Sequence, residues 1–503
     1  MRKFITALQF ALLVVCSNLA WSQSTRQTFN PIIPDFVADP SLSIFDGTYY
    51  LYGTTDIDKG LAQMGPPVVW KSRDFVNWEF EGTLIHGIDW SKAYTYTDAK
   101  GVQKLGYFRY WAPGRVLKKD GRYYLFATIV KPDEQMGTYV LIADKPEGPF
   151  RFANGTGIYF QQPDKSGEES KPLIADIDGE PFVDDDGQAY IFWRRRNAGR
   201  LSADWLSIDS PAVQVPTKHA GYSEGPAMFK RKGVYYYIYT LSANANYCNA
   251  YTISNSGPLG PFTNPVNDNI FIYSDVHKNI WGPGHGNVFQ LPGKDEYLFL
   301  YLEYGEGGTT RQVWANRIAF NTDSTIKRVS LDAQGVGYLA KNNARRKNPV
   351  IPANASASSF KPDKTITASI DTLPNALKNF SSRASGANAV TGSRTSSYHP
   401  NKAMDGSNGT RWIPDSADVT PWYVLDMGKA MILKQCEVFF TLPAYGHAWT
   451  LEKSTDGKNW SKVYQQQEAL QRSPQTASGI GKARYLRITA QKGAMGIWEI
   501  KVF

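Results

Sequence analysis

The sequence predicts an all-β protein whose N-terminal part is a five-bladed β-propeller. Two observations carry this prediction: a turn followed by an aromatic-rich strand recurs five times, and an unusual residue precedes each copy at a similar distance. The irregular intervals between copies exclude a tight solenoid and fit propeller blades with loop insertions. A chain of 503 residues is also too long for one ordinary core, which indicates at least two domains.

The five copies share a turn and a strand of large apolar residues. In chain order they are DGTYYLYGT from Asp46, DGRYYLFAT from Asp120, DGQAYIFWR from Asp186, KGVYYYIYT from Lys232 and KDEYLFLYL from Lys294. In the first four copies an Asp-Gly or Lys-Gly pair predicts a tight hairpin turn, and the residues that follow predict a buried strand. In the fifth copy Pro292 and Gly293 place the turn slightly earlier.

The strand before each hairpin begins with a residue that is unusual at a strand entrance. Eight to ten residues before the turn lie, in chain order, Asp39, Trp111, Asp178, Glu224 and His285. We expect these five residues to occupy the same phase of their blades. Because the innermost strands of a propeller run side by side along its central channel, three carboxylates, an indole and an imidazole should ring one pocket.

The motifs around these residues resemble glycoside hydrolase family 43, whose members are five-bladed propeller enzymes acting mostly on arabinose- and xylose-containing plant polysaccharides. The motifs are VADPSL, YWAPG, DIDGEPFVDDDGQAY, SEGPAMF and GPGHGNVF, and the resemblance covers about residues 29–340. It implies that Asp39 is the general base, Glu224 the general acid, and Asp178 the residue that modulates the pKa of the acid and orients it. Inverting hydrolysis needs such an acid and base, about 6.5 to 9.5 Å apart.

The same resemblance implies substrate-binding roles for Trp111, Arg311 and His285, and places His285 near a calcium ion. Their alternatives are a packed core tryptophan, a surface arginine and a buried turn histidine. The three consecutive acids at 184–186 are expected to form the lip of a hairpin rather than a metal site.

Residues 1–22 have the features of an export signal. Arg2 and Lys3 precede the apolar run FITALQFALLVV, which is too short to span a bilayer. We therefore expect an exported protein, periplasmic or extracellular, without a transmembrane segment. Lipid attachment at Cys16 is the alternative, although Val15 stands where a lipobox has a small residue.

The composition excludes several other classes. Removing residues 1–22 lowers the formal charge from +9 to +7, a mild basic balance that scattered surface side chains explain, with a preference for acidic polysaccharide as the alternative. The sequence has no stripe of basic residues of the kind that would indicate a nucleic-acid partner. After cleavage only Cys248 and Cys436 remain, so a disulfide framework is not expected.

The C-terminal part follows a predicted linker at residues 341–378, which is rich in Asn, Ser, Ala and Pro and could also serve as a strap between domains. Over residues 379–503 the runs YHPNKAMDGSNGTRWIPD, PWYVLDMGKAMILKQCEVFF and IWEIKVF resemble a discoidin-like (coagulation factor 5/8 type C, family 32-like) carbohydrate-binding module. This family is a β-sandwich of the jelly-roll type. A protein-docking or stabilising role is the alternative to sugar binding.

The second resemblance also assigns residues. It implies that Asp405, Thr410 and Glu499 hold a structural calcium ion, completed by backbone carbonyl oxygens. Candidates for sugar contact are Tyr445, His447 and Trp449, whereas Trp412, Trp422 and Trp460 are expected in the core.

Together the two resemblances imply an exported, exo-acting, inverting glycosidase that releases terminal pentose from a plant polysaccharide or oligosaccharide. An α-L-arabinofuranosidase is favoured, a β-xylosidase is second and a galactan-directed glycosidase third. No cofactor is expected for the chemistry, apart from structural Ca²⁺. The alternative from a different class is a non-catalytic glycan-binding protein, against which the three retained carboxylates argue. The sequence leaves the oligomeric state open.

Overall fold

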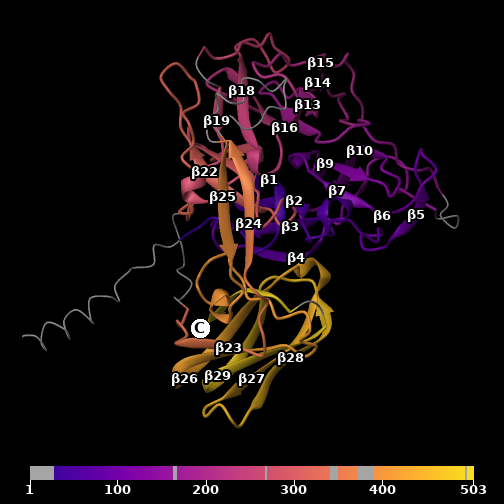
Figure 1. Ribbon diagram of the computed structural model, residues 1–503. Helices are drawn as coiled ribbons and strands as arrows, with labels where there is room; N and C mark the ends of the chain where they lie inside the picture. The colour runs from indigo at the N-terminus through magenta and orange to yellow at the C-terminus, as the bar shows by residue number, and fades with distance from the viewer. Residues whose placement is uncertain (1–27, 162–166, 267–268, 340–348, 372–388, 493–494) are drawn as a thin grey trace, which may run out of the picture.

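The computed structural model describes residues 28–503 except for 162–166, 267–268, 340–348, 372–388 and 493–494. The described residues form an all-β molecule in which a propeller lies above a second β-structure (Figure 1). The predicted export signal falls outside the described residues. Within the described ranges, no helix is long and apolar enough to cross a membrane.

Five antiparallel sheets form the blades of the propeller. The first contains β1 (Val37–Phe45), β2 (Thr48–Thr55), β3 (Val68–Ser72) and β4 (Glu79–Thr83). The second contains β7 (Arg109–Trp111), β8 (Leu117–Lys119), β9 (Arg122–Val130), β10 (Met136–Ala143) and β11 (Arg151–Phe152). The third contains β12 (Glu180–Val183), β13 (Ala189–Trp193), β14 (Asn197–Arg200) and β15 (Val213–Gln214).

The last two blades complete the ring. The fourth contains β16 (Ser223–Arg231), β17 (Val234–Leu241), β18 (Cys248–Ser254) and β19 (Ile270–Ile272). The fifth contains β20 (Gly284–Gln290), β21 (Tyr297–Glu303) and β22 (Gln312–Ile318). A separate hairpin of β5 (Tyr94–Thr97) and β6 (Gln103–Gly106) lies between the first and second blades in the chain.

The predicted hairpin turns are present. At Asp46-Gly47 the two φ angles are 48° and 75°, and at Lys232-Gly233 they are 50° and 81°. Positive φ at both central residues defines a type I′ turn, which glycine adopts without strain and which matches the twist of the flanking strands. The acids at 184–186 lie at the hairpin between β12 and β13, whose turn is of a different type. Lys230 pairs with two of them at 2.8 Å, so the prediction that they form the lip of a hairpin is confirmed.

Each blade packs against the next through a hydrophobic cluster. In the cluster that closes the ring, Leu298 and Leu300 of the fifth blade pack with Leu51 and Trp70 of the first. The segment before β1 reinforces this closure, because the amide of Ile32 donates to the carbonyl oxygen of Val313 in β22 at 2.9 Å. The strand entrances of all five blades are thereby held around one channel.

The C-terminal structure is built on one large sheet. Its strands are β23 (Asn354–Ala357), β26 (Trp422–Phe440), β27 (His447–Ser454), β28 (Ser461–Leu470), β29 (Gln475–Lys492) and β30 (Ile497–Val502). As predicted, Trp412 is fully buried in its core. Trp422 is 36% exposed, so its core prediction is wrong, and Trp460 is half-buried beneath the guanidinium of Arg487.

The prediction of a linker over 341–378 is wrong for its described part, residues 349–371, which contains two strands; residues 341–348 and 372–378 lie outside the described residues. β23 pairs with β26 and so belongs to the C-terminal sheet. β24 (Lys364–Asp371) pairs with β25 (Ala389–Ser396), and this long hairpin extends from the C-terminal structure alongside the propeller (Figure 1). Their polar, small-residue composition concealed the strands, although β24 alternates between more and less exposed side chains.

Within the described part of the chain, Cys248 in the propeller and Cys436 in the C-terminal sheet are buried and not joined by a disulfide.

Candidate active site

A left-handed backbone residue lies at the inner-strand entrance of every blade. With φ in degrees, these residues are Asp39 (51), Ala112 (30), Asp178 (66), Gly225 (52) and His285 (42). Residues other than glycine seldom adopt positive φ, so its recurrence indicates that the five blades share one bent entrance. In β1, β16 and β20 the bend coincides with an irregularity in strand pairing.

The expectation that all five predicted residues share one phase is wrong for Trp111 and Glu224. Each lies one residue before the left-handed position, which Ala112 and Gly225 occupy in their blades. In the strand pairing, Glu224 accordingly corresponds to Ala38. Counting from the hairpin turns could not detect this offset, because that distance itself varies from blade to blade.

Asp39 is buried and surrounded by positive charge. Its Oδ1 lies 3.4 Å from Nη1 of Arg311 and 3.6 Å from Nδ1 of His285. Burial alone would raise the pKa of Asp39, but Arg311, His285 and a hydrogen bond from Thr54 lower it below its usual value. A carboxylate held in its charged form in this way can accept a proton.

Arg311, which immediately precedes β22, is oriented by Asp56. The Nε and Nη2 atoms of Arg311 donate to the two carboxylate oxygens of Asp56 at 2.9 and 2.8 Å, and its amide donates at 2.8 Å. Both side chains are buried, and a bidentate pair fixes the plane of the guanidinium. The arginine predicted to bind substrate therefore lies against the predicted base.

Asp178 has the opposite electrostatic environment. Its Oδ2 accepts a hydrogen bond from the amide of Gly225 at 3.1 Å, which connects it to the residue after Glu224. Burial raises the pKa of Asp178 to about 7; His285 opposes this shift and the charge of Glu224 adds to it. Asp178 can therefore hold a proton near neutral pH.

Two tyrosines hold the carboxyl group of Glu224. The hydroxyl of Tyr222 donates to Oε2 at 2.6 Å, and the hydroxyl of Tyr247 donates to Oε1. Tyr247 is half-buried, and Tyr222 is 48% exposed. One side of this carboxyl group thus faces the interior, and the other is close to the surface.

His285 links the acidic groups. Burial would lower the pKa of His285, but the charges of Asp39, Asp178 and Glu224 raise it. Its amide donates to Oγ1 of Thr240 at 3.0 Å, which fixes the bent backbone.

The cavity that His285 lines together with Asp178 and Glu180 does not fit a calcium ion with bound waters. It has a volume of about 10 Å³, room for about one water molecule. Calcium takes six to eight oxygen ligands, so the predicted metal role of His285 has no support in this geometry.

Trp111 is half-buried at the entrance of the second blade. The guanidinium of Arg109 lies 4.9 Å from the centre of its ring, and Arg109 is itself held by Glu134 at 2.5 Å. One face of the indole is therefore covered, and stacking on a sugar would use the rest of the ring.

Sequence reasoning missed Asp56, Tyr222 and Tyr247. Asp56 follows a buried strand, which is a usable signal because charged residues are uncommon there. The two tyrosines gave no signal, since the chain is rich in aromatic residues and neither lies in a recurring motif.

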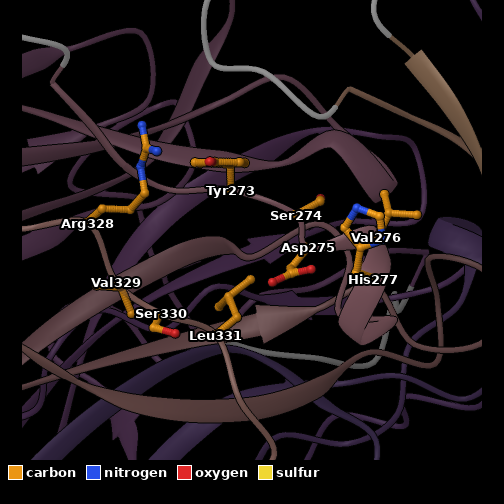
Figure 2. Close-up of a pocket in the computed structure, with 9 residues that line it drawn as sticks. All are labelled: Tyr273, Ser274, Asp275, Val276, His277, Arg328, Val329, Ser330 and Leu331. Carbon is orange, nitrogen blue, oxygen red and sulfur yellow. The ribbon is translucent and has the colours of Figure 1, made fainter.

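A more open groove lies elsewhere on the propeller. It has a volume of about 430 Å³ and is lined by the segments at 273–277 and 328–331, with the guanidinium of Arg328 over the ring of Tyr273 at 4.9 Å (Figure 2). None of the residues predicted to act on substrate lines this groove.

In the C-terminal structure, Asp405, Thr410 and Glu499 lie together as predicted. Oγ1 of Thr410 donates to Asp405 at 2.7 Å, and the amide of Gly406 donates to Glu499 at 3.0 Å. Burial raises the pKa of Glu499 to about 8, with Lys501 opposing and Asp405 adding to the shift. Among the described residues, no group of three or more acidic, histidine or cysteine side chains could hold a metal ion, so a calcium site here remains a prediction that relies on hydroxyl and carbonyl oxygens as well.

Two of the three candidate sugar contacts in this structure are wrong. His447 is 1% exposed and Trp449 is fully buried, so neither can stack on a ligand. Tyr445 is 39% exposed and borders a groove against His86 and Trp90 of the propeller.

This propeller has one ionised and one proton-holding carboxyl group at its channel. Glycoside hydrolases use a pair of carboxyl groups in these two protonation states. The chain belongs to the glycosyl hydrolases family 43, whose model matches residues 28–326. The model of the F5/8 type C domain matches residues 384–501. Both predicted families are thereby confirmed.

Several known proteins are similar. A solved structure described as a glycoside hydrolase is 36% identical, covers 95% of this chain and 99% of its own, and superposes with a TM-score of 0.79. The beta-D-galactofuranosidase xynD of Aspergillus niger is 26% identical over 63% of this chain and 89% of its own length. A xylosidase/arabinosidase of Thermoclostridium stercorarium is 24% identical over 62% of this chain and 68% of its own.

Proposed function

We propose that the protein is an exported, inverting glycosidase that releases terminal α-L-arabinofuranosyl residues from plant polysaccharide side chains. The observation that carries the proposal is that Asp39 and Asp178, both buried at the channel, have pKa values shifted in opposite directions, with Glu224 beside Asp178. Carboxyl groups driven toward different protonation states mark the base and the acid of a glycosidase.

In the proposed mechanism Asp39 takes a proton from the attacking water. Arg311 and His285 keep Asp39 ionised, so it is ready to act as a base. Glu224 donates a proton to the leaving oxygen, and Asp178, which accepts a hydrogen bond from the amide of Gly225, is the neighbouring group that modulates and orients this acid. Tyr222 and Tyr247 orient the acid through their hydrogen bonds.

The similarity to named enzymes supports a furanose substrate. Among the relatives are the beta-D-galactofuranosidase of Aspergillus niger and a non-reducing end alpha-L-arabinofuranosidase of Bacteroides ovatus. The β-D-galactofuranosyl and α-L-arabinofuranosyl rings share one configuration and differ by a hydroxymethyl group on the exocyclic carbon. A β-D-galactofuranosidase is therefore the second candidate. A β-xylosidase, which acts on a pyranose, is the third.

A panel of 4-nitrophenyl glycosides separates these candidates. We expect the highest kcat/KM on the α-L-arabinofuranoside, with measurable activity on the β-D-galactofuranoside and less on the β-D-xylopyranoside. Faster hydrolysis of the xyloside would favour the third candidate. No hydrolysis of any glycoside or natural polysaccharide would favour a non-catalytic glycan-binding protein.

Proton NMR of the first product tests the stereochemistry separately. Inversion predicts that the first arabinose signal belongs to the anomer opposite to that of the substrate. Appearance of the substrate's own anomer would indicate a retaining mechanism and would remove Asp39 from the role of base.

The F5/8 type C domain is proposed to bind a structural calcium ion and a glycan. The oxygen atoms of Asp405, Thr410 and Glu499 would hold the ion, which would neutralise a buried carboxyl group. Tyr445 remains the candidate for sugar contact because it is exposed. Removal of divalent ions by a chelator should lower the melting temperature if the ion is bound.

A further inference from the structure

The loop that leads into Arg311 is compact. It connects β21 to β22 and contains Glu306, whose amide donates to Oγ1 of Thr310 at 2.9 Å. Gly305 and Thr310 form a parallel bridge, and a Cβ on Gly305 would lie 1.9 Å from the carbonyl oxygen of Thr310. The two ends of the loop are therefore in direct contact, and Arg311 is the next residue of the chain after this contact.

A buried ion pair ties this loop to the F5/8 type C domain. Nη1 and Nη2 of Arg411 donate to the two carboxylate oxygens of Glu306 at 3.1 and 2.8 Å. The hydroxyl of Tyr398 donates to Glu306 at 2.8 Å. The Arg411 and Glu306 side chains are only 8% and 12% exposed. A bidentate pair fixes the orientation of both groups, and losing one partner strands the other in the interior.

The ion pair is charged at every pH at which the enzyme would be assayed. Burial alone would raise the pKa of Glu306, but Arg411 and hydrogen bonds that include one from Tyr398 lower it to about 2.

Arg411 also contacts the segment that leads into Asp39. Its guanidinium lies 4.6 Å from the centre of the Phe36 ring and 4.8 Å from that of Trp498. Phe36 and Trp498 pack edge to face with their centres 4.9 Å apart, and β1 begins at the next residue. One side chain of the second domain thus touches both chain segments that enter the site.

The β24–β25 hairpin also contacts the loop between β21 and β22. Arg394 of β25 donates to Oε1 of Glu303 at 2.7 Å and to the carbonyl oxygen of Gly305. Its guanidinium lies 4.5 Å from the centre of the Trp281 ring. The loop between β21 and β22 is therefore held at Glu303, Gly305 and Glu306 by residues from beyond the propeller.

We infer that Arg411 is a positioning residue for the reaction, which through Glu306 sets the place of Arg311 and hence its contact with Asp39. The F5/8 type C domain is then part of the catalytic unit and not only a tethered binding module. The inference rests on the proposed role of Asp39 as the base.

The pH dependence of the enzyme reports this contact. The charged and titratable groups that face Asp39 are Arg311, His285, Asp178, Asp56 and Tyr247. Of these, Arg311 contributes the largest lowering of the Asp39 pKa. If Arg311 moves away, burial raises that pKa, and the acid limb of kcat/KM moves to higher pH.

The test compares full-length variants on the best aryl glycoside. Arg411→Met should lower kcat/KM about ten- to a hundredfold, mainly through kcat, and should move the acid limb to higher pH. Arg411→Lys, which keeps the charge, should recover part of the lost kcat/KM and move the acid limb part of the way back. Arg472→Ala is the matched control, because Arg472 pairs with Glu81 across the same interface but is 52% exposed, and it should change neither quantity.

A folded Arg411→Met variant with wild-type kcat/KM and an unmoved acid limb would overturn the inference. If Arg411→Met does not fold, Glu306→Gln decides, because it keeps the shape of the side chain but removes its charge and one of its two oxygen acceptors. An unmoved acid limb in Glu306→Gln would also overturn the inference. A wild-type protein without activity on any glycoside would instead overturn the proposed function, and this inference with it.

Discussion

At the residue scale, two buried aspartates of one channel differ in their pKa because their neighbours differ. Asp39 faces Arg311 and has a lowered pKa, whereas Asp178 faces Glu224 and has a pKa raised to about 7. His285 lies between them and interacts with both. The bent entrance that the blades share brings these groups together, and the partner of each aspartate decides its charge.

The variant Asp178→Asn tests this division of roles. Burial and the charge of Glu224 raise the pKa of Asp178 to about 7, so this pair of carboxyl groups retains one proton near neutral pH. Without Asp178 that retention is lost, so the basic limb of kcat/KM should move to lower pH. The acid limb, which reports Asp39, should stay nearly in place. Rates measured from pH 3 to 9 check this outcome, and a shift of the basic limb to higher pH would contradict it.

Asp39, Asp178, Glu224 and His285 could be predicted from the sequence, because each lies in a motif of a few residues at a blade entrance. Asp56 could not be assigned to Arg311 in the same way, since 255 positions separate the two residues in the chain. The one-residue offset of Glu224 also escaped prediction, because it depends on a backbone bend and not on spacing.

At the element scale, four of the five blade hairpins were predictable because Asp-Gly and Lys-Gly pairs favour tight hairpin turns, and those at Asp46, Asp120 and Lys232 are of type I′. The β24–β25 hairpin was not, because its strands are polar and 17 residues separate their facing ends. Its contact with the propeller centres on Ile370. This side chain is fully buried and packs in one cluster with Ala245 and Trp281 of the propeller.

Ile370→Ala should therefore destabilise the protein by about 2 to 5 kcal/mol, since it leaves a cavity against the propeller. Val390→Ala on the partner strand is the control, because Val390 is 42% exposed and its loss should cost about 0.5 kcal/mol or less. Denaturant unfolding measures both. Equal effects of the two substitutions would show that the hairpin does not depend on this contact.

At the scale of the whole molecule, the two domains are joined by a charged and buried interface. Glu306 has a pKa of about 2, below its ordinary value of 4.5, because of its pairing with Arg411. A depressed carboxyl pKa stabilises the folded state above the ordinary value, and this contribution is lost as the pH falls from about 4.5 toward about 2.

Glu306→Gln should therefore be less stable than the wild type at pH 7 by about 3 kcal/mol, and the gap should narrow as the pH falls below about 4.5. Unfolding free energies from pH 7 down to pH 3 give this difference. A gap that stays constant over the whole range would mean that the ion pair does not couple the domains to pH.

The central claim, that Asp39 is the base and Glu224 the acid, is tested most directly by varying the leaving group. The test compares Glu224→Gln and Asp39→Asn on two substrates: a 2,4-dinitrophenyl glycoside, whose leaving group needs no proton, and the matching oligosaccharide. Glu224→Gln should keep most activity on the first substrate and lose about 10² to 10⁴ in rate on the second, whereas Asp39→Asn should lose a similar factor on both. Equal losses on both substrates for Glu224→Gln, or an active Asp39→Asn, would contradict the account.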